Sequence, residues 1–389
     1  MEEDRLSRTV FLHVGVAKTG TTYLQRLLFA NRELLRSAGV LYPGQRPEAH
    51  FLASMDLRDA GLGGHKYPAA AGRWAKLANT VNCFDGTAVI SHETLSRARR
   101  PAIQRAIEAF ETDDIRVVLT TRDLGRQIPA VWQENVKNRN PQTYADFLHG
   151  VLVGVPPAKP GPGKPDLVRL VSFWWPQNLP KMVGRWAPVV GTDKVVLVTV
   201  PPLGSPRDEL WKRFATAVEL PVLDYEFDVV GENVSLGAAE AELMRRVIAY
   251  VPAEVDWPRW KNRVKRGLGE RTLASMGAGG RILVPKQWHD VLADISEQMI
   301  ADLAASGVRV VGDLDDLRPR FDQEDGLLPD DVSDAELLEC ASAALAQMAS
   351  APPEHVRSVH NAPTQRPENG DPQRTRGEAN VQKEKPRRG

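Results

Sequence analysis

Residues 10–28, VFLHVGVAKTGTTYLQRLL, constrain the fold of this 389-residue chain more than any other stretch. Apolar side chains alternate along residues 10–16, which predicts a buried strand. Gly15 and Gly20 bracket a short loop in which the backbone turns sharply and can approach a ligand closely. Apolar residues then recur at helical spacing from Tyr23 onward. Because such a loop directs backbone N–H groups and the start of a helix at one place, the sequence predicts an anion-binding site there.

The spacing of the two loop glycines matches the Walker pattern GxxxxGK[ST], in which a lysine and a hydroxyl residue follow the second glycine. Thr22 occupies the hydroxyl position, but Thr21 stands where the Walker lysine belongs, and the cation lies inside the loop as Lys18. In a P-loop NTPase the lysine reaches the β- and γ-phosphates, and the hydroxyl residue holds Mg²⁺. A lysine earlier in the loop is better placed for the bond between a phosphate and the group that is transferred from it.

The segment KTGTTYLQ behind an HVG strand resembles the 5′-phosphosulfate loop of sulfotransferases that use 3′-phosphoadenosine 5′-phosphosulfate (PAPS). A strand that ends in TTRD and an NVSL segment near residue 233 add to the resemblance, which spans roughly residues 9–250. It implies a P-loop-like α/β enzyme that moves a sulfuryl group from PAPS to a hydroxyl or amine. The acceptor would be a small molecule, lipid or saccharide.

The resemblance also implies roles for the loop residues. Lys18 would face the oxygen that bridges phosphorus and sulfur, where negative charge develops during transfer. Thr19, Gly20, Thr21 and Thr22 would supply N–H and hydroxyl donors to the 5′-phosphosulfate. Since the group in flight carries less negative charge than a phosphoryl group, no metal is expected as a cofactor.

Arg122 ends the TTRD strand and matches the arginine of the family's 3′-phosphate motif. A planar guanidinium suits a terminal phosphate because it donates paired hydrogen bonds; the alternative is an ion pair with the adjacent aspartate. The family commonly has a serine eight residues later, where this chain has Ala130, so Arg126 and Gln127 are candidates to complete the site. Residues 265–267 resemble the family's late basic-glycine segment in composition only.

Two adjacent residues compete for the role of general base. Glu93 and His92 both follow the apolar run of residues 87–91, and related sulfotransferases use a glutamate or a histidine to deprotonate the acceptor. We favour Glu93, because the polysaccharide-type branch of the family carries a glutamate in a comparable strand-to-helix corner. Burial would also raise the pKa of such a carboxylate towards the working pH. Its alternative role is that of an acidic residue at a helix start. His13 lies within the first strand and is expected to be a core histidine.

Strand and helix patterns alternate along the chain, which predicts a P-loop NTPase-like parallel sheet flanked by helices on both faces, with a helical C-terminal part. Ligands of such sheets bind at the carboxyl ends of the strands. We therefore expect the loop, Glu93 and Arg122 to meet at one edge. Irregular structure is predicted for residues 43–68 and 154–165, from which the acceptor pocket would come. The strands are predicted at residues 10–16, 40–41, 87–93, 115–123, 193–201 and 308–311.

Composition excludes several classes of protein. The chain has 50 basic and 50 acidic residues, so no overall positive field favours nucleic acid as a partner. Two cysteines cannot form a disulfide framework, and a reduced, cytoplasmic setting is expected. No stretch has the run of about 20 apolar residues that a membrane span requires. The oligomeric state cannot be deduced from these features.

We expect three parts in the chain. Residues 1–315 would form the sulfotransferase domain and residues 316–350 a helical extension, in which Ser333 and Glu336 form a capping box. Residues 351–389 lack aromatic, Leu, Ile and Met side chains and are expected to be a disordered tail.

Two other functions stay open from the sequence alone. A small-molecule kinase with a displaced P-loop lysine would bind ATP and depend on Mg²⁺. A non-catalytic nucleotide-binding protein, favoured by Ala130, would bind the nucleotide without turnover.

Overall fold

The computed structural model describes residues 8–59, 61, 67–153, 173–228, 235–277, 280–321 and 328–350. The described residues up to Ala349 belong to one compact unit. Our predictions for residues 154–165, for the start of the NVSL segment and for the tail at 351–389 fall outside the described residues.

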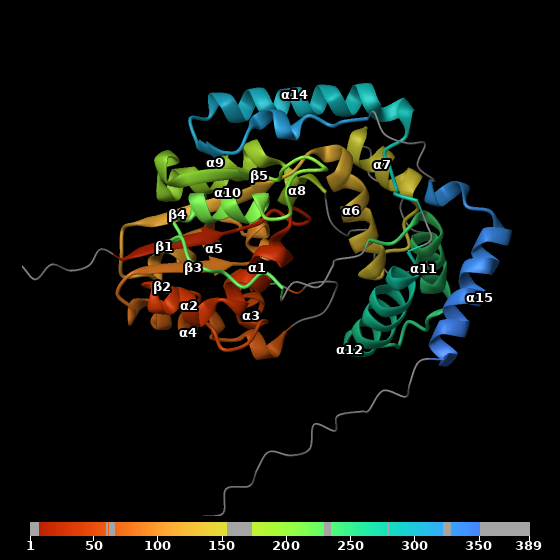
Figure 1. Ribbon diagram of the computed structural model, residues 1–389, viewed down its shortest axis with the longest axis horizontal. Helices are drawn as coiled ribbons and strands as arrows, with labels where there is room; N and C mark the ends of the chain where they lie inside the picture. Colours follow the sequence, from red (N-terminus) through yellow and green to blue (C-terminus); the bar gives the residue numbers. More distant parts are fainter. Residues whose placement is uncertain are drawn as a thin grey trace, which may run out of the picture. The chain divides into compact units, whose positions relative to one another are not determined.

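A parallel sheet of six strands forms the centre of this unit, in the order β2-β3-β1-β4-β5-β6 (Figure 1). All five strand pairs are parallel, and the first strand pairs with β3 on one side and β4 on the other. Each predicted strand is present, although most are shorter than expected because the polar residues at their carboxyl ends turn into loops. The strands are β1 (Thr9–His13), β2 (Val40–Leu41), β3 (Thr87–Ser91), β4 (Ile115–Thr121), β5 (Val195–Thr199) and β6 (Arg309–Val311).

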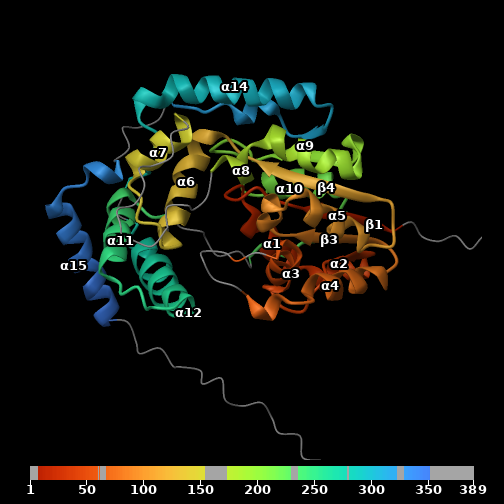
Figure 2. The same cartoon turned by 180° about the vertical axis from the view of Figure 1, so that it is seen from behind.

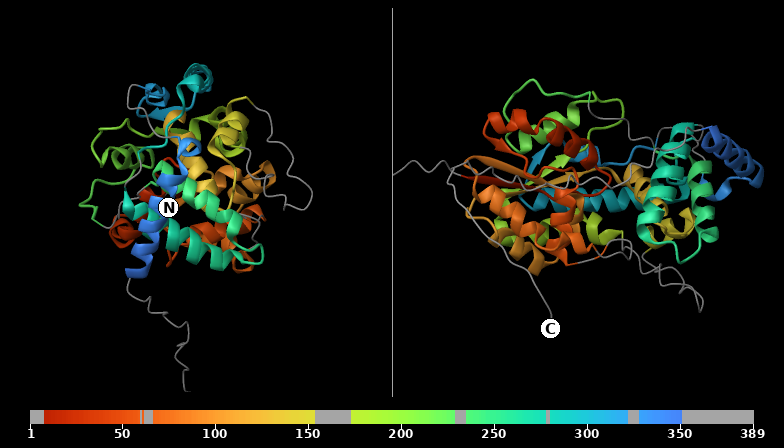
Figure 3. Two further views of the ribbon diagram at one scale, coloured as in Figure 1. Left: turned by 90° about the vertical axis from the view of Figure 1, so that its right-hand side faces the viewer. Right: turned by 90° about the horizontal axis from the view of Figure 1, so that it is seen from below.

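Helices cover both faces of the sheet, as Figure 3 shows. Side chains alternate along a strand, so Phe11 packs into one buried cluster while Val10 and Leu12 pack into another on the opposite face. The predicted P-loop-like α/β architecture is therefore confirmed. The Phe11 face is covered by α1 (Thr21–Ala30), α2 (Arg32–Ser37) and α10 (Glu209–Ala217), and the opposite face by α4 (Arg73–Asn82), α5 (Arg100–Glu108) and α9 (Leu179–Val190).

A second group of helices begins with α6 (Leu124–Lys137), which follows β4 directly (Figure 2). It packs against neighbours on several sides, and α14 also packs against α9. These neighbours are α7 (Tyr144–Leu152), α11 (Ala238–Tyr250), the π-helix η5 (Trp260–Leu273) and α14 (His289–Ala305).

The remaining helices are mostly short. One of them, α3, corrects the sequence analysis, because it lies within residues 43–68, which we predicted to be irregular. Its buried face packs against α4 and α5 and against the start of the segment that follows β3, and the side chain of His50 contacts the carbonyl of Pro43, which anchors the segment despite its glycines and prolines. These helices are α3 (Ala49–Arg58), η1 (Pro68–Ala70), η2 (Glu93–Arg97), α8 (Trp174–Gln177), η4 (Thr192–Lys194), α12 (Trp257–Arg259), α13 (Ala274–Met276), η6 (Lys286–Trp288), η7 (Leu314–Leu317), η8 (Pro329–Asp331) and α15 (Asp334–Ser350).

The capping box before α15 is confirmed. The Glu336 carboxylate accepts from the backbone N–H of Ser333 at 2.8 Å, and the Ser333 hydroxyl accepts from the N–H of Glu336 at 3.3 Å. Cys83 and Cys340 are both free thiols. Among the helices in the described ranges, none combines the length and apolar character that crossing a membrane requires.

Candidate functional site

The loop between β1 and α1 lies at the carboxyl edge of the sheet, as predicted. Lys18 has a φ of 69° and Gly20 a φ of 82°, so both adopt the left-handed conformation that favours glycine. A Cβ on Gly20 would lie 2.5 Å from Cδ2 of Leu210, which explains why this position needs glycine. Within the described part of the chain, no group accepts a hydrogen bond from the backbone N–H groups of residues 18–22. These donors at the start of α1 are therefore available to an anion.

A buried hydrogen-bond chain anchors the loop from beneath. The Thr19 hydroxyl contacts the carbonyl of Val16 and the hydroxyl of Thr120, each at 2.6 Å. Thr120 also lies 3.1 Å from Nε2 of His13, whose Nδ1 contacts the Ser91 hydroxyl at 2.7 Å. Burial lowers the pKa of His13 to about 3, so this imidazole is neutral and structural, as expected from the sequence. A ligand could use the N–H of Thr19 but not its hydroxyl.

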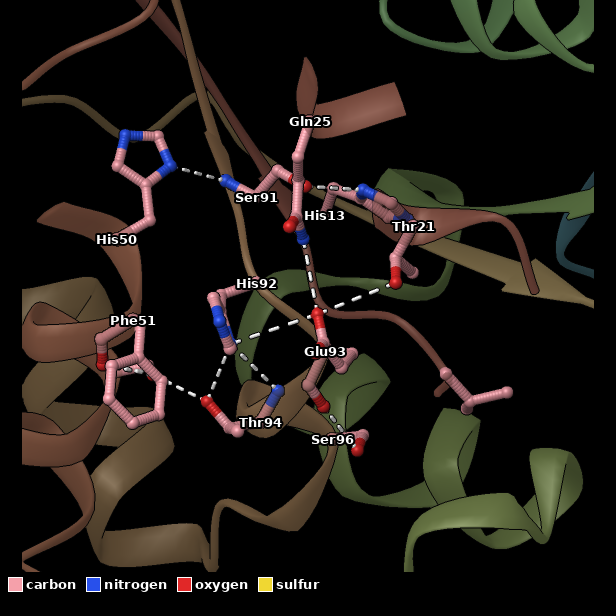
Figure 4. A network of polar contacts seen from close by, with 12 residues as sticks. His13, Thr21, Gln25, His50, Phe51, Ser91, His92, Glu93, Thr94 and Ser96 are labelled. Carbon is pink, nitrogen blue, oxygen red and sulfur yellow. Dashed lines mark hydrogen bonds and ion pairs between the residues drawn. The ribbon is translucent and has the colours of Figure 1, made fainter. Parts of the chain in front are cut away.

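Glu93 begins η2, directly beside the loop (Figure 4). Its Oε2 accepts from Nε2 of Gln25 at 3.1 Å and from the Thr21 hydroxyl at 3.4 Å, and it lies 3.8 Å from Nδ1 of His92. Burial alone would raise the pKa of Glu93, but His92 and the Gln25 donor outweigh burial and lower it. Our expectation of a raised pKa is therefore wrong. Glu93 is an ionised carboxylate, still 29% exposed, that can accept a proton but is a weak base.

His92 caps the helix that Glu93 begins. Its Nδ1 accepts from the backbone N–H of Thr94 at 3.2 Å and lies 2.8 Å from the Thr94 hydroxyl, which in turn contacts the hydroxyl of Ser54. Burial lowers the pKa of His92, although the charge of Glu93 opposes this effect. Since one ring nitrogen is engaged by a backbone donor, the side chain positions its neighbour and is less suited than Glu93 to receive the acceptor proton.

On the other side of the loop, the Lys18 ammonium lies 3.0 Å from Oε2 of Glu134 on α6. Oε1 of the same carboxylate accepts from Lys265 of η5 at 2.6 Å, and Lys265 also donates to Oδ1 of Asn138 at 2.8 Å. Burial would raise the pKa of Glu134, but the two ammonium groups outweigh it and hold this pKa well below its usual range. Glu134 therefore keeps Lys18 between the loop and α6. The Lys18 side chain is 31% exposed.

Two arginines, Arg122 and Arg126, lie at the end of β4. Arg122 donates from Nη1 to the carbonyl of Lys18 at 3.3 Å, and its buried Nε has no partner among the described residues. Asp123 pairs with Arg126 and not with Arg122, so the alternative ion pair for Arg122 is wrong. Burial lowers the pKa of Arg122 to about 10, and the positive charges of Arg126 and Arg281 add to this effect. The carboxylate of Asp123 opposes these charges but pairs with Arg126, so the Arg122 Nε, which has no partner among the described residues, indicates a place for an anion.

Ala130 supplies no hydroxyl at the position of the family's serine. Gln127 was a candidate, but its amide donates to the carbonyl of Ala17 at 3.0 Å and to Oε1 of Gln177 at 2.7 Å. It therefore supports the loop instead of facing a ligand. Ala130 and Glu134 lie four residues apart, on one face of α6. On this face of α6, the carboxylate of Glu134 contacts Lys18.

The structure gathers most of the predicted site residues around one loop. Thr21 contacts Glu93 directly, Lys18 belongs to the same loop but pairs with Glu134, and Arg122 touches the loop backbone. Thr22 is exposed at the start of α1. The sequence analysis did not single out Glu134, Asn138 or Arg281. A signal for Glu134 existed, since it is an acidic residue four positions after Ala130 on the helix that follows β4. For Arg281 we find no sequence signal.

The described residues hold no group of three or more acidic, histidine or cysteine side chains that could ligate a metal ion, and metal independence stays a prediction.

Comparisons with known proteins give one distant likeness. No family model matches the chain, and no curated protein matches it. Among solved structures, a sulfotransferase from Alicyclobacillus acidocaldarius matches with 15% sequence identity and a TM-score of 0.38, over 66% of this chain and 96% of that one. The geometry of the site, and not this likeness, carries the argument that follows.

Proposed function

We propose that this chain is a sulfotransferase that moves a sulfuryl group from PAPS to a hydroxyl or amine of an acceptor. The observation that carries the proposal is the loop after β1, in which the N–H groups of residues 18–22, without acceptors among the described residues, accompany a lysine inside the loop. Walker loops place that lysine after the second glycine. The loop is thus arranged for a phosphate whose transferred group lies on the side of Lys18.

The residues present fit the nucleotide. The 5′-phosphosulfate would accept hydrogen bonds from the N–H groups of residues 18–22. The 3′-phosphate would accept from the Nε of Arg122, which has no partner among the described residues, and the charge of Arg281 would favour it. PAPS supplies an activated sulfuryl group. Lys18, released from Glu134, would stabilise the charge that develops on the bridging oxygen, an effect worth roughly 3–4 kcal/mol for a positioned donor.

Glu93 would accept the acceptor proton. Its Oε2 is already held by Gln25 and Thr21, which fixes the carboxylate beside the loop. A base with a lowered pKa removes a hydroxyl proton only as the S–O bond forms, so proton transfer would accompany sulfuryl transfer. His92 would act as a positioning residue through its contact with Glu93.

Nucleotide binding and turnover can be tested separately. Thermal unfolding with adenosine 3′,5′-bisphosphate should show stabilisation that ATP with Mg²⁺ does not match. Transfer of radiolabelled sulfate from PAPS to an acceptor panel should survive chelators and fall by about 10²–10³-fold in Lys18→Ala, while Lys76→Ala on α4, an exposed lysine, should keep wild-type activity. Preference for ATP with Mg²⁺ would support a kinase instead, and binding without turnover would support a non-catalytic protein.

A further inference from the structure

Three arginines beside the helix that Glu93 begins have no carboxylate partner among the described residues. They are Arg58 of α3, Arg97 at the end of η2 and Arg185 of α9, and we call them the arginine set. In the part of the chain that the structure describes, the Nε atoms of Arg58 and Arg185 are buried without a hydrogen-bond partner. Within the same ranges, Arg122 is the other arginine with such an Nε, and we assign it to the nucleotide. A buried cation is unfavourable unless an anion neutralises it.

The contact that Arg58 makes is weak. Its Nη1 donates to the sulfur of Met55 at 3.7 Å. The carboxylate of Asp56, on the same helix, accepts from the backbone N–H groups of Gly72 and Trp74 at 3.1 and 2.9 Å, and so is engaged elsewhere. Burial lowers the pKa of Arg58 to about 10, which agrees with a guanidinium that has lost water without gaining a counterion.

Arg185 is held by neutral groups. It donates to the carbonyl oxygens of Ser96 at 2.9 Å and Trp175 at 3.0 Å, and to the sulfur of Met182 at 3.0 Å. Its guanidinium lies 4.4 Å from the centroid of the Trp175 ring, and this tryptophan is 43% exposed. The bond to Ser96 places Arg185 next to Arg97, and the exposed ring shows that the arginine set borders the surface.

Other partly buried arginines of this chain lie against carboxylates. Arg116 pairs with Asp114 and Arg213 pairs with Asp316, and the two arginine side chains are 30% and 18% exposed. Partial burial by itself therefore does not explain why the arginine set is unpaired.

Two contacts show how α3 and η2 lie against each other. The ring of Phe51 on α3 lies 5.3 Å from that of His92, which caps η2 (Figure 4). One turn later, the hydroxyl of Ser54 on α3 contacts the hydroxyl of Thr94 in η2. Both helices therefore advance in the same direction, and later residues on these faces also lie opposite each other.

The next residues on these faces are arginines. Arg58 follows Ser54 by four residues and so shares its face of the α-helix. Arg97 follows Thr94 by three residues, which places it directly above Thr94 in a 3₁₀ helix. The structure thus brings Arg58 and Arg97 together at the end of the contact between α3 and η2. The charge of Arg97 lowers the pKa of Arg58, as expected for two neighbouring cations.

The arginine set lies at a fixed distance from the candidate base. Glu93 and Arg97 are the first and last residues of η2. A 3₁₀ helix rises about 2 Å per residue, so their backbones are about 8 Å apart. Glu93 is 29% exposed, so both ends of η2 are accessible to a ligand. Arg122, by contrast, follows β4 and donates to the loop carbonyl of Lys18.

We propose that the arginine set binds an oxyanion of the acceptor, so that the enzyme sulfates a hydroxyl or amine on a molecule that already carries a carboxylate, sulfate or phosphate group. This inference rests on the proposed function, because Glu93 marks where the reacting group lies. Guanidinium groups suit such oxyanions because their N–H groups donate paired hydrogen bonds. A neutral acceptor would leave the buried Nε atoms of Arg58 and Arg185 without partners.

The test fills the nucleotide site first and then compares sugars that differ in charge. Protein saturated with adenosine 3′,5′-bisphosphate is titrated with glucose 6-sulfate, with sodium glucuronate, and with glucose as the neutral control, at constant ionic strength. Calorimetry should detect at least tenfold tighter binding of the two acidic sugars than of glucose. Arg58→Met should weaken the binding of the acidic sugars roughly tenfold, as expected for the loss of one charge-assisted contact.

Thermal unfolding of the same variant separates binding from a structural role. Arg58→Met removes a partly buried cation that has no counterion, so the protein without ligand should be as stable as the wild type or more stable. An arginine that serves the fold would give the opposite result, a loss of stability with sugar binding unchanged.

Three further variants control for charge and folding. Arg97→Lys keeps the cation and should retain most of the affinity for acidic sugars. Arg36→Met, at an exposed arginine of α2 on the opposite face of the sheet from α9, should match the wild type. Should Arg58→Met fail to fold, Arg97→Met carries the same test.

The possible results separate this inference from the proposed function. Equal affinities for glucose and the acidic sugars, or wild-type binding in a destabilised Arg58→Met, would overturn the inference while nucleotide binding stands. Loss of adenosine 3′,5′-bisphosphate affinity in Arg58→Met would assign the arginine set to the nucleotide and overturn the inference alone. Inorganic sulfate that binds the wild type and is not displaced by glucose 6-sulfate would assign it to a free anion, with the same consequence. If the nucleotide itself does not bind, the proposed function fails, and the inference fails with it.

Discussion

The two sides of the loop after β1 hold their carboxylates by different means. On one side, which we call the Glu93 side, the carboxylate accepts from the neutral amide of Gln25 and stands at the end of a sheet strand. On the other, the Glu134 side, the carboxylate lies between the ammonium groups of Lys18 and Lys265 and is carried by helices. The first side depends on hydrogen bonds connected to the buried sheet, and the second on charge.

This difference predicts different sensitivities. The Glu93 side connects through Ser91 to two buried neutral histidines, so acid should act on it first. The Glu134 side is partly exposed, so salt should weaken it, because screening acts on charges that solvent reaches. The following four predictions test this contrast.

The largest effect should come from acid acting on the histidines behind the Glu93 side. Burial lowers the pKa of His13 to about 3 and that of His50 to about 4. Both bind a proton more readily when unfolded, so their contribution to stability is complete above about pH 6.5 and is lost as the pH falls below it. For each histidine, the unfolding free energy should fall by about 1.4 kcal/mol per pH unit as the pH is lowered from about 6 to 4.5.

Urea unfolding at a series of pH values measures this slope. His50→Gln should remove about half of the slope that the two histidines cause, since one of the two titrating groups is gone. His149→Gln, at an exposed histidine on α7, should leave it unchanged. An unchanged slope in His50→Gln would mean that the buried histidines do not explain the acid sensitivity of the Glu93 side.

The second effect concerns the backbone that both sides share. Gly20→Ala places a Cβ 2.5 Å from Leu210 at a φ of 82°, which should cost about 1–3 kcal/mol of stability. It should also lower the affinity for adenosine 3′,5′-bisphosphate, because the N–H groups beside it move. Gly184→Ala, in helix α9 with open space around it, should be neutral or slightly stabilising. Equal effects of the two changes in thermal unfolding and nucleotide titration would contradict the strain at Gly20.

The place of Glu93 could be predicted from the sequence, whereas the contact between Glu134 and Lys265 could not. Glu93 follows a strand with a clear apolar pattern, and the carboxyl ends of parallel strands meet at one edge, so its place beside the loop followed from a general rule. Glu134 and Lys265 lie on helices whose orientation depends on packing between distant parts of the chain. Their contact joins positions 131 residues apart, for which no local pattern exists.

The fold itself was predictable because its strands are continuous apolar runs. Helix α3 was missed since the segment around it is rich in glycine and proline, while the contact that anchors it is made by a single histidine, His50, across the chain. The direction of the Glu93 pKa was missed for a similar reason. The sequence suggests burial, but it does not show that His92 and the donor Gln25 together outweigh burial and lower the pKa.

The third effect should be seen at Glu134→Gln. This change leaves Lys18 and Lys265 facing each other without a charged partner, and should cost about 1–2 kcal/mol at pH 7, less than for a fully buried pair because the site is partly exposed. The cost should shrink in about 1 M salt. Because the pKa of Glu134 is lowered in the folded state, the wild-type advantage is complete above about pH 4.3 and is lost as the pH falls further.

Unfolding experiments at low and high salt check this prediction, with the exposed Glu339→Gln on α15 as the matched control, which should behave as the wild type. A cost that does not depend on salt would mean that Glu134 acts through packing, and the contrast between the two sides would then be lost.

The smallest effect should come from Thr21→Val on the Glu93 side. The Thr21 hydroxyl donates to Glu93 over a long distance of 3.4 Å, and Gln25 remains as a second donor, so the loss in unfolding free energy should be about 0.5 kcal/mol or less. This loss should not depend on salt, in contrast to that of Glu134→Gln, because the hydroxyl is neutral. Thr21→Ser keeps the donor, so any loss that it causes reflects the missing buried methyl group and should likewise not depend on salt. A loss in Thr21→Val as large as that in Glu134→Gln, or one that salt removes, would show that charge governs both sides of the loop and that the division drawn between them is wrong.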